Sequence, residues 1–231
     1  MIQVNIRSRP DAMNAHIQKF SRELFQALGK DALSKTCSRG VLVFREGDPY
    51  LGPWLLEKGS VVLVKSSLAG KEQIVRQVDA GEVFAEVPLF KNVGWYPINA
   101  RCSTACELYL LPAERVRALL NSDPKLAWSA ACALADRITG FRDSLLDITL
   151  ADARKRLILY LLRRLDGKPN ASLGVVRLGI SQQDLALLLG IRAESLSRAL
   201  SELEGEGKLK RLSRQTFQLF KKQISKEDME W

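Results

Sequence analysis

The feature of this sequence that most constrains its fold is the stretch 180–204, which predicts two short helices separated by a glycine turn. Ser181 followed three residues later by Asp184 is typical of a helix start, because such side chains can satisfy free backbone N–H groups of the first turn. Gly190 then ends the first helix. In the second helix, apolar residues recur at i, i+3, i+4 and i+7, which predicts one buried face. The opposite, exposed polar face comprises Glu194, Ser197, Arg198 and Ser201.

This exposed face has the size and chemistry to read DNA. The major groove of B-form DNA admits one α-helix, whose N-terminal side chains then meet the base edges. Arg198 can donate to guanine, and Glu194 can accept from cytosine or orient Arg198. The alternative is an ordinary surface helix with an ion pair between these two residues. The segments LKRL and TFQLF, separated by SRQ after Gly207, predict two short strands around a polar turn, and this basic wing favours the DNA-binding interpretation.

Charge is concentrated where the helix-turn-helix is predicted. Residues 150–231 hold 16 Lys and Arg against 10 Asp and Glu, whereas residues 1–149 hold 19 against 16. Basic side chains near a wing can contact phosphates, which fixes the register on DNA without reading sequence. The residues concerned are Lys208, Lys210, Arg211, Arg214, Lys221 and Lys222.

Length and composition set limits on the rest of the chain. A chain of 231 residues with 46% hydrophobic content can bury one substantial core and a smaller one, so we expect two cores. No apolar run approaches the roughly 18 residues of a membrane span, and no signal-peptide pattern opens the sequence. The four cysteines show no disulfide framework. These features together predict a cytoplasmic protein.

Between about residues 37 and 112, short apolar segments are separated by glycines, which mark hairpin turns. We expect an antiparallel β-roll or jelly roll here, preceded by helical structure from Ala12 to Leu28. Asp123 and Pro124 then provide an N-cap and a first helical residue for a long helix. The predicted fold is therefore α+β. Its parts are a β-roll sensor domain at 1–122, a dimerisation helix and hinge at 123–149, and a winged helix-turn-helix domain at 150–231.

The long helix carries apolar residues at alternating spacings of four and three. Such a seam packs either on its own domain or on a second copy. Helix-turn-helix proteins usually read two half-sites about 34–36 Å apart, which requires a two-fold axis. The seam therefore predicts a parallel homodimer. Its residues are Ala131, Leu134, Ile138, Phe141, Leu145 and Ile148.

The whole arrangement resembles the Crp/Fnr family of bacterial transcription regulators, over nearly all of the chain. GVLVFREGDPYLGPWLLEKGSVVLV is similar to the first strands of the family's β-roll, and GEVFAEVPLF is similar to its effector cassette. Glu194, Ser197 and Arg198 match the E-x-x-S-R pattern of its recognition helix. DARKRLILYLLRRL, from Asp152, resembles the helix that follows the family's hinge.

The resemblance implies a set of DNA contacts. Glu194, Ser197 and Arg198 would read bases, and RNA polymerase would be a further partner. Ala193 stands where cyclic-AMP-responsive members have a second base-reading arginine, so the expected half-site is closer to TTGA than to TGTGA, in an inverted repeat. The expected contacts to the DNA backbone are Ser181, Gln182, Arg192, Ser195, Lys210, Arg211 and Arg214.

Departures from the family pattern concern the effector. Members that bind cyclic nucleotides place an arginine and a small hydroxyl residue after the LF pair, because a cyclic phosphate needs a paired cation. This chain has Tyr96 and Pro97 there, and Phe141 and Arg142 replace two hydroxyl residues that contact adenine. We therefore expect an effector other than cyclic AMP. Arg101 could reach inward to pair with a phosphate, but the alternating pattern does not show which way its side chain points. The expected effector pocket comprises Phe84, Glu86, Leu89, Trp95, Tyr96, Pro97 and Phe141.

The identity of the effector stays open from the sequence. Members with a Tyr-Pro pair resemble regulators of nitrogen-oxide, redox or anaerobic metabolism, some of which bind haem. Axial-ligand candidates are His16, the cysteines or an N-terminal group. No cysteine precedes Cys37, so an iron-sulfur cluster held by N-terminal cysteines is not expected. In one extended strand Cys102 and Cys106 would lie about 13 Å apart, too far for a disulfide.

Two other classes of function are alternatives to a DNA-binding regulator. An enzyme is not expected, because the sequence has no phosphate-binding glycine loop, no HExxH motif, no nucleophile elbow and a single histidine. The second alternative is a protein-docking module related to cyclic-nucleotide domains, without specific DNA binding. A preference for a palindrome over random DNA would separate it from a regulator.

Overall fold

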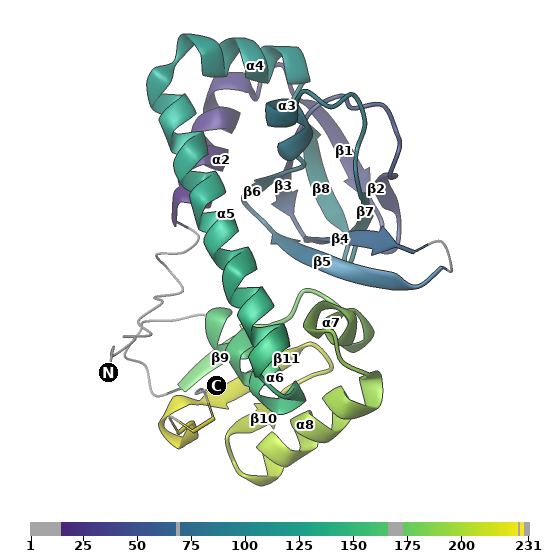
Figure 1. The fold of residues 1–231 in the computed structure, drawn as a ribbon, viewed down its shortest axis with the longest axis vertical. Helices are drawn as coiled ribbons and strands as arrows, with labels where there is room; N and C mark the ends of the chain where they lie inside the picture. Colours follow the sequence, from purple (N-terminus) through teal and green to yellow (C-terminus); the bar gives the residue numbers. More distant parts are fainter. Residues whose placement is uncertain (1–14, 68–69, 166–172, 226, 229–231) are drawn as a thin grey trace.

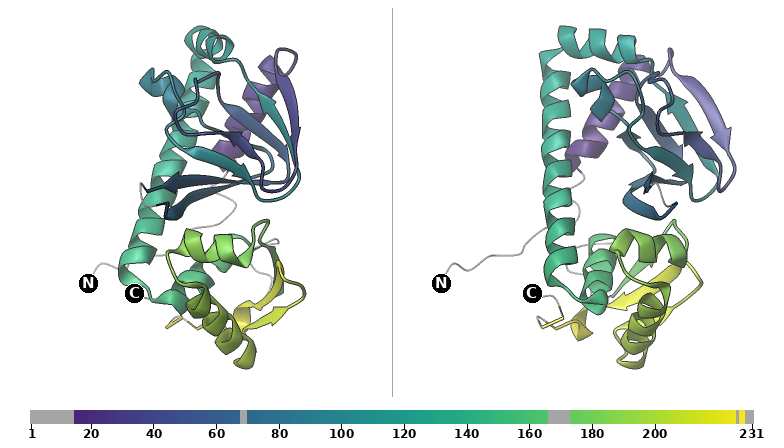
Figure 2. Two further views of the ribbon diagram at one scale, coloured as in Figure 1. Left: turned by 90° about the vertical axis from the view of Figure 1, so that its right-hand side faces the viewer. Right: turned by 45° about the vertical axis from the view of Figure 1, so that its right-hand side comes forward.

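The structure is a computed structural model that describes residues 15–67, 70–165, 173–225 and 227–228. A β-roll, a long helix and a mixed helical and stranded C-terminal domain follow one another along the chain (Figure 1). The long helix runs beside both other parts, and the C-terminal domain lies beneath the β-roll (Figure 2). The predicted α+β fold is confirmed.

The β-roll consists of two four-stranded antiparallel sheets, with strand orders β1-β8-β3-β6 and β2-β7-β4-β5. The strands are β1 (Leu33–Cys37), β2 (Leu42–Phe44), β3 (Trp54–Lys58), β4 (Ser60–Ser66), β5 (Glu72–Asp79), β6 (Glu82–Phe84), β7 (Asn99–Cys102) and β8 (Cys106–Leu110). The predicted turn glycines have positive φ values, and Gly59 also has no room for a side chain, since a Cβ would lie 2.3 Å from the Ala105 carbonyl oxygen. Strand β1 was not predicted, because its alternation of Ser, Lys and Thr carries little apolar signal.

Three helices cover one side of the roll. They are α2 (Ala15–Leu28), the short α3 (Val87–Lys91) and α4 (Ala113–Ser122). The predicted first helix began at Ala12, and residues 12–14 lie outside the described residues. Ser21, buried on α2, donates to the Ile17 carbonyl and accepts from the Val83 backbone N–H, which fixes α2 to strand β6.

The long helix α5 (Pro124–Leu150) begins as predicted at Asp123, whose side chain accepts from the backbone N–H groups of Lys125 and Leu126. Its first half packs against α2 through buried Leu126, Ala130 and Ala133. Its second half extends beyond the roll toward the C-terminal domain (Figure 1). The chain then turns into α6 (Ala153–Arg163), capped by the Asp152 side chain.

The C-terminal domain contains the predicted helix-turn-helix and wing. Its elements are α6, β9 (Leu173–Arg177), α7 (Gln182–Leu189), α8 (Ala193–Gly205), β10 (Leu209–Arg211), β11 (Thr216–Phe220) and the 3-10 turn η1 (Lys221–Gln223). The sheet order is β10-β11-β9, so the wing hairpin gains a third strand that we had not predicted. The LGVVR segment of β9 is short and follows a Gly- and Pro-containing stretch, which hides its strand character in the sequence.

The expectation that Cys102 and Cys106 share one extended strand is wrong. Cys102 ends β7 and Cys106 begins β8, and residues 103–105 form a turn between the two strands. The 13 Å estimate assumed a single extended strand, whereas the turn brings both thiols into one core cluster with Cys37. All four cysteines are free, and these three are buried.

Candidate DNA interface and effector seat

The second helix of the helix-turn-helix, α8, presents its predicted reading residues outward. Glu194, Ser197 and Arg198 are exposed. The opposite face of the helix, comprising Leu196, Ala199, Leu200 and Leu203, is fully buried. Glu194 and Arg198, both among the described residues, form no ion pair with each other. Both side chains are therefore free to enter a DNA groove.

The turn that supports α8 is fixed by named contacts. The Ser181 side chain accepts from the Asp184 backbone N–H at 3.0 Å, as the predicted helix start requires. Gly190 ends α7 in the left-handed conformation, with φ of 64°. Arg156 of α6 donates to the Leu189 carbonyl at 3.2 Å and to the Ile148 carbonyl at 2.6 Å. One guanidinium therefore joins the C-terminal ends of α5 and α7.

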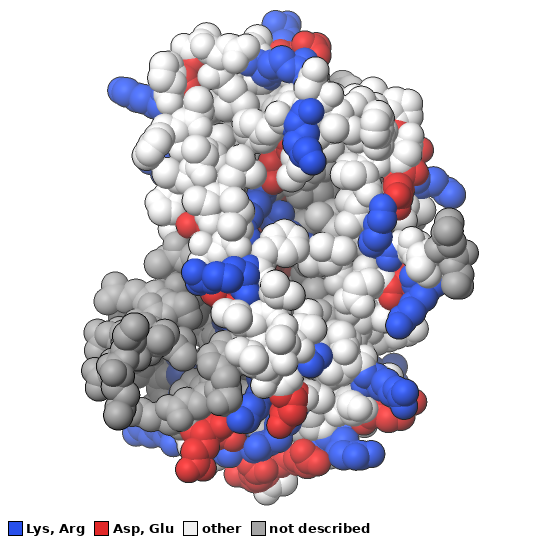
Figure 3. Space-filling view, in the orientation of Figure 1, with Lys and Arg blue, Asp and Glu red and all other residues white. Residues whose placement is uncertain are grey.

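The residues predicted to contact the DNA backbone have different surroundings. Arg192, Lys210 and Arg214 are exposed. Arg211 is half-buried and pairs with Glu204, with 3.1 Å between its Nε and the carboxylate. Lys and Arg alternate with Asp and Glu over the C-terminal domain in the view of Figure 3, so this view shows no uniformly basic face.

The other three predicted backbone contacts are half-buried. The Gln182 amide donates to the Arg214 carbonyl at 3.2 Å, which ties α7 to the wing. Ser195 lines a groove between α8 and the start of α6, together with Arg198. Ser181 is half-buried and lines a hollow between α7 and the β-roll. The structure thus brings the predicted residues to one domain but leaves them unequally free.

The apolar seam of α5 is exposed over its second half. Ile138, Phe141, Leu145 and Ile148 are 70%, 54%, 64% and 43% exposed. Of the seam's first residues, Ala131 is exposed and Leu134 is half-buried. The alternative in which this seam packs on its own domain is therefore wrong for the second half. An exposed apolar row of this length is typical of an interface.

The seven residues predicted to line the effector pocket do not line one cavity. Phe84 and Tyr96 lie inside the roll core, whereas Leu89 belongs to the separate core under α2 and α5. Trp95, Pro97 and Phe141 are exposed. In the single chain these residues therefore lie in two cores and on the outer surface.

Tyr96 is packed within the core of the roll. Its ring stacks on Phe44 with centroids 3.8 Å apart. Its hydroxyl donates to the Gly52 carbonyl at 2.8 Å and accepts from the Trp54 indole N–H at 3.1 Å. Tyr96, which stands where members that bind cyclic nucleotides have an arginine, is thus a core residue with its hydroxyl hydrogen-bonded. Burial raises the pKa of this hydroxyl.

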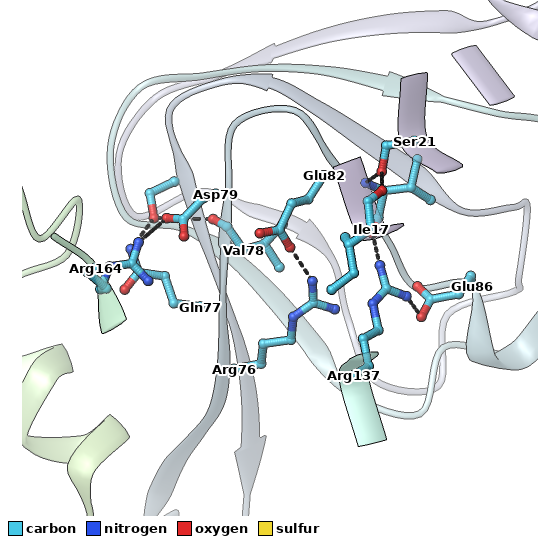
Figure 4. Close-up of polar contacts among 12 residues, drawn as sticks. Ile17, Ser21, Arg76, Gln77, Val78, Asp79, Glu82, Glu86, Arg137 and Arg164 are labelled. Carbon is cyan, nitrogen blue, oxygen red and sulfur yellow. Dashed lines mark hydrogen bonds and ion pairs between the residues drawn. The ribbon is translucent and has the colours of Figure 1, made fainter. Parts of the chain in front are cut away.

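Glu86 of the predicted pocket has a partner that sequence reasoning missed. Its buried carboxylate forms an ion pair with Arg137 of α5, and Arg137 also donates to the Val83 carbonyl. Next to them, Arg76 of β5 pairs with Glu82 (Figure 4). Burial, followed by the charge of Arg76, lowers the pKa of Arg137 to about 9, so its guanidinium stays protonated at neutral pH. The only sequence signal was an arginine directly beside a seam residue, which is also typical of a solvated helix face.

A polar joint connects the roll to the C-terminal domain. Arg101 of β7, which the sequence did not place, pairs with Asp184 of α7 at 3.0 Å and with Glu72 at 3.4 Å. The Gln73 amide donates to the Leu187 carbonyl at 2.5 Å. Arg101 therefore faces the helix-turn-helix and not the inside of the roll.

The second half of this joint lies on strand β5. The Gln77 amide donates to the Leu178 carbonyl at 2.7 Å and accepts from the Tyr160 hydroxyl at 2.8 Å. Asp79 pairs with Arg164, which directly follows α6 (Figure 4). Apolar residues of the roll, including Ile74, belong to the same core cluster as the helices of the C-terminal domain. The two domains are thus packed together, not merely tethered.

The candidate haem ligands that the structure describes, His16 and the four cysteines, lie in different parts of the molecule. His16 is exposed and bonds to Asp136 at 3.0 Å. Cys37, Cys102 and Cys106 lie within the roll core, and Cys132 is half-buried on α5. The N-terminal group lies outside the described residues. Within the described ranges no three His, Cys, Asp or Glu side chains are grouped to hold a metal, and no helix is long and apolar enough to cross a membrane.

Two family models match the chain. Residues 34–123 match a cyclic nucleotide-binding domain, and residues 155–221 match a Crp-like helix-turn-helix domain. Together these matches cover about two thirds of the sequence, and they coincide with the β-roll and the C-terminal domain described above.

Individual relatives agree with these models. The CRP-like protein Clp of Xanthomonas oryzae pv. oryzae is 26% identical over 174 residues, which covers 72% of this chain and 75% of Clp. The solved structure of CLP from Xanthomonas campestris, described as a c-di-GMP responsive global regulator, has a TM-score of 0.67 at 25% identity and covers 87% of this chain and 98% of that one. FixK2 from Bradyrhizobium japonicum shares the fold with a TM-score of 0.75 at 21% identity, over 87% and 98% of the two chains.

Proposed function

The chain belongs to the Crp/Fnr family of transcription regulators, and we propose that it binds an inverted repeat in double-stranded DNA as a homodimer. The observation that carries this proposal is the outward placement of Glu194 and Arg198 on a helix whose other face is buried. In this proposal the pair reads base edges in the major groove, Ser197 lies against them, and each half-site is TTGA-like.

The exposed apolar row on α5 supports the homodimer. Two copies that bury Ile138, Phe141 and Leu145 against each other would create the two-fold axis that an inverted repeat requires. The same axis would place two α8 helices on one side of the dimer. Contact with RNA polymerase is a further part of the proposal, which transcription in vitro from a promoter carrying the repeat would test.

Fluorescence anisotropy at physiological salt tests the DNA-binding proposal. A labelled duplex with two inverted TTGA half-sites is compared with a shuffled duplex of the same composition. The proposal predicts a preference for the repeat of about a thousandfold or more. Equal affinity for both duplexes would instead support the alternative of a protein-docking module without specific DNA binding.

We also propose that cyclic AMP is not the effector. Tyr96 is stacked on Phe44 in the roll core, and Glu86 is already paired with Arg137. A small effector that binds the Glu86 carboxylate would have to displace that guanidinium first. Haem, nitric oxide and redox signals, which the sequence suggested, are the alternative effectors in this proposal. Calorimetry with cyclic AMP, cyclic GMP and c-di-GMP, the last because Clp is described as responsive to it, measures this directly. Micromolar binding of cyclic AMP or cyclic GMP would contradict the proposal.

A further inference from the structure

Strand β6 and Glu86, which follows it closely, hold a buried guanidinium. The Glu86 carboxylate and the Val83 carbonyl both accept from the guanidinium of Arg137, which enters from α5. The site is closed to solvent, because the side chains of Arg137 and Glu86 are only 9% and 5% exposed. It is formed by the β-roll and filled from the dimerisation helix.

Simple anchoring of α5 does not explain this arrangement. The same helix is already held by buried Leu126, Ala130 and Ala133, and apolar packing of this kind carries no desolvation penalty. A buried guanidinium is tolerated only when carboxylates and carbonyls replace its water. Arg76 and Glu82 form a second buried pair beside it, so two cations and two carboxylates balance. An anionic ligand at this site would leave negative charge in excess. A planar cation in the place of the Arg137 guanidinium keeps the positive and negative charges equal.

The site is also connected to the DNA-binding domain. Arg76 binds Glu82 from strand β5, and the same strand carries Gln77 and Asp79, which bond to Leu178 and Arg164. Figure 4 shows three groups of contacts arranged side by side: Arg164 with Asp79, Arg76 with Glu82, and Arg137 with Glu86. The position of α5 in the site is therefore coupled to the strand on which the helix-turn-helix domain rests.

We propose that Glu86 and Val83 form a guanidinium-binding site that the chain fills with its own Arg137, so that the DNA-binding arrangement is held without a diffusible effector. A ligand shifts a conformational equilibrium only through unequal affinity for the two arrangements, and a tethered side chain can do this as well as a free molecule. Tethering also keeps the group at an effective concentration in the millimolar range, so the site stays filled. The inference rests on the proposed function for its readout.

Chemical rescue of Arg137→Ala tests the proposal in the full-length protein. We expect the variant to bind the inverted repeat about tenfold or more weakly than the wild type. Guanidinium chloride at about 20 mM, in the range of a tethered group, should restore most of that affinity. Methylammonium at the same ionic strength should not, because it lacks the planar fork that pairs with a carboxylate and a carbonyl. Ionic strength is held constant because DNA binding depends on salt.

Matched variants separate this role from general stability. Asp136 is next to Arg137 on α5 and contacts His16 of α2. Asp136→Asn changes that contact and should leave DNA affinity unchanged. Glu86→Gln should weaken binding without rescue by guanidinium. Arg137→Lys keeps the charge but lacks the planar fork, so it should bind the repeat about as weakly as Arg137→Ala, and it serves as the test variant if Arg137→Ala fails to fold. Circular dichroism and sedimentation verify that each variant is folded and has the wild-type oligomeric state.

Three results would overturn the proposal. The first is an Arg137→Ala protein that is folded and binds the repeat as tightly as the wild type. The second is equal rescue by guanidinium and methylammonium. The third is a wild type, shown by mass spectrometry to carry no small molecule, that binds the repeat only after a cell-derived ligand is added; this would leave the proposed function intact. Failure of the wild type to prefer the repeat under any condition would instead reject the proposed function itself.

Discussion

At the residue scale, Arg198 and Lys210 are both exposed cations in the C-terminal domain, but they belong to different elements. Arg198 lies on α8 beside Glu194, where a bidentate contact to guanine is geometrically possible. Lys210 lies on wing strand β10, where a flexible ammonium suits a phosphate. The two residues should therefore differ in what they contribute to DNA binding.

We expect Arg198→Ala to cost about 1–3 kcal/mol on the inverted repeat and to flatten the preference among sequences. Lys210→Ala should weaken all duplexes alike and reduce the salt dependence of binding by about one charge. Anisotropy titrations of both variants at several salt concentrations measure both effects. A comparable loss of sequence preference in the two variants would contradict these roles.

The residues also show what the sequence could and could not predict. The caps at Asp123 and Ser181, the turn at Gly190 and the exposed face of α8 follow from local patterns, because each depends on neighbours within four residues. The pairs Arg137–Glu86 and Arg101–Asp184 join residues 51 and 83 positions apart, and no local spacing indicates them. The distribution of the predicted pocket residues over two cores and the surface could not be predicted for the same reason, since long-range packing decides which side chains converge.

At the scale of elements, α5 performs two tasks with its two halves. The first half contributes buried residues to the core under the roll, and the second half exposes an apolar row. Arg156 then fixes the end of α5 to the end of α7 by bonding to carbonyls of both helices. A change in the helix would therefore be transmitted directly to the helix-turn-helix.

Leu145→Asp places a charge in the centre of the exposed row, where Leu145 is 64% exposed in the single chain. The substitution should leave the subunit folded, because the side chain contributes little to its own core. We expect it to convert the dimer to monomers in sedimentation experiments and to abolish preference for the repeat, since burying an unpaired carboxylate at an interface is costly. Ser144→Asp, one residue away, serves as a control for added charge. A Leu145→Asp protein that remains dimeric would place the dimer interface elsewhere.

At the scale of the whole molecule, the roll and the C-terminal domain share a core. Ile74 of β5, which is 1% exposed, clusters with the buried helices of the C-terminal domain, and the polar joint surrounds this contact. Two domains that share a core should unfold together, in contrast to domains joined by a flexible linker. The orientation of α8 is thereby tied to the roll.

We expect the wild type to show one thermal unfolding transition in calorimetry. Ile74→Asp should split it into two, because a buried unpaired carboxylate would separate the domains while leaving each core largely intact. Val78→Asp, on the same strand but inside the roll core, should instead destabilise the roll alone. Two separate transitions already present in the wild type would contradict the shared core.

In the proposed dimer, two α8 helices face DNA across a two-fold axis, and their separation matches one helical turn of the duplex. The most direct measurement is the affinity of the purified protein for a series of duplexes in which the distance between inverted TTGA half-sites is changed one base pair at a time. The affinity should be highest when the half-site centres are about 10 base pairs apart and should fall steeply at shorter and longer distances. An affinity that does not depend on this distance would contradict this arrangement.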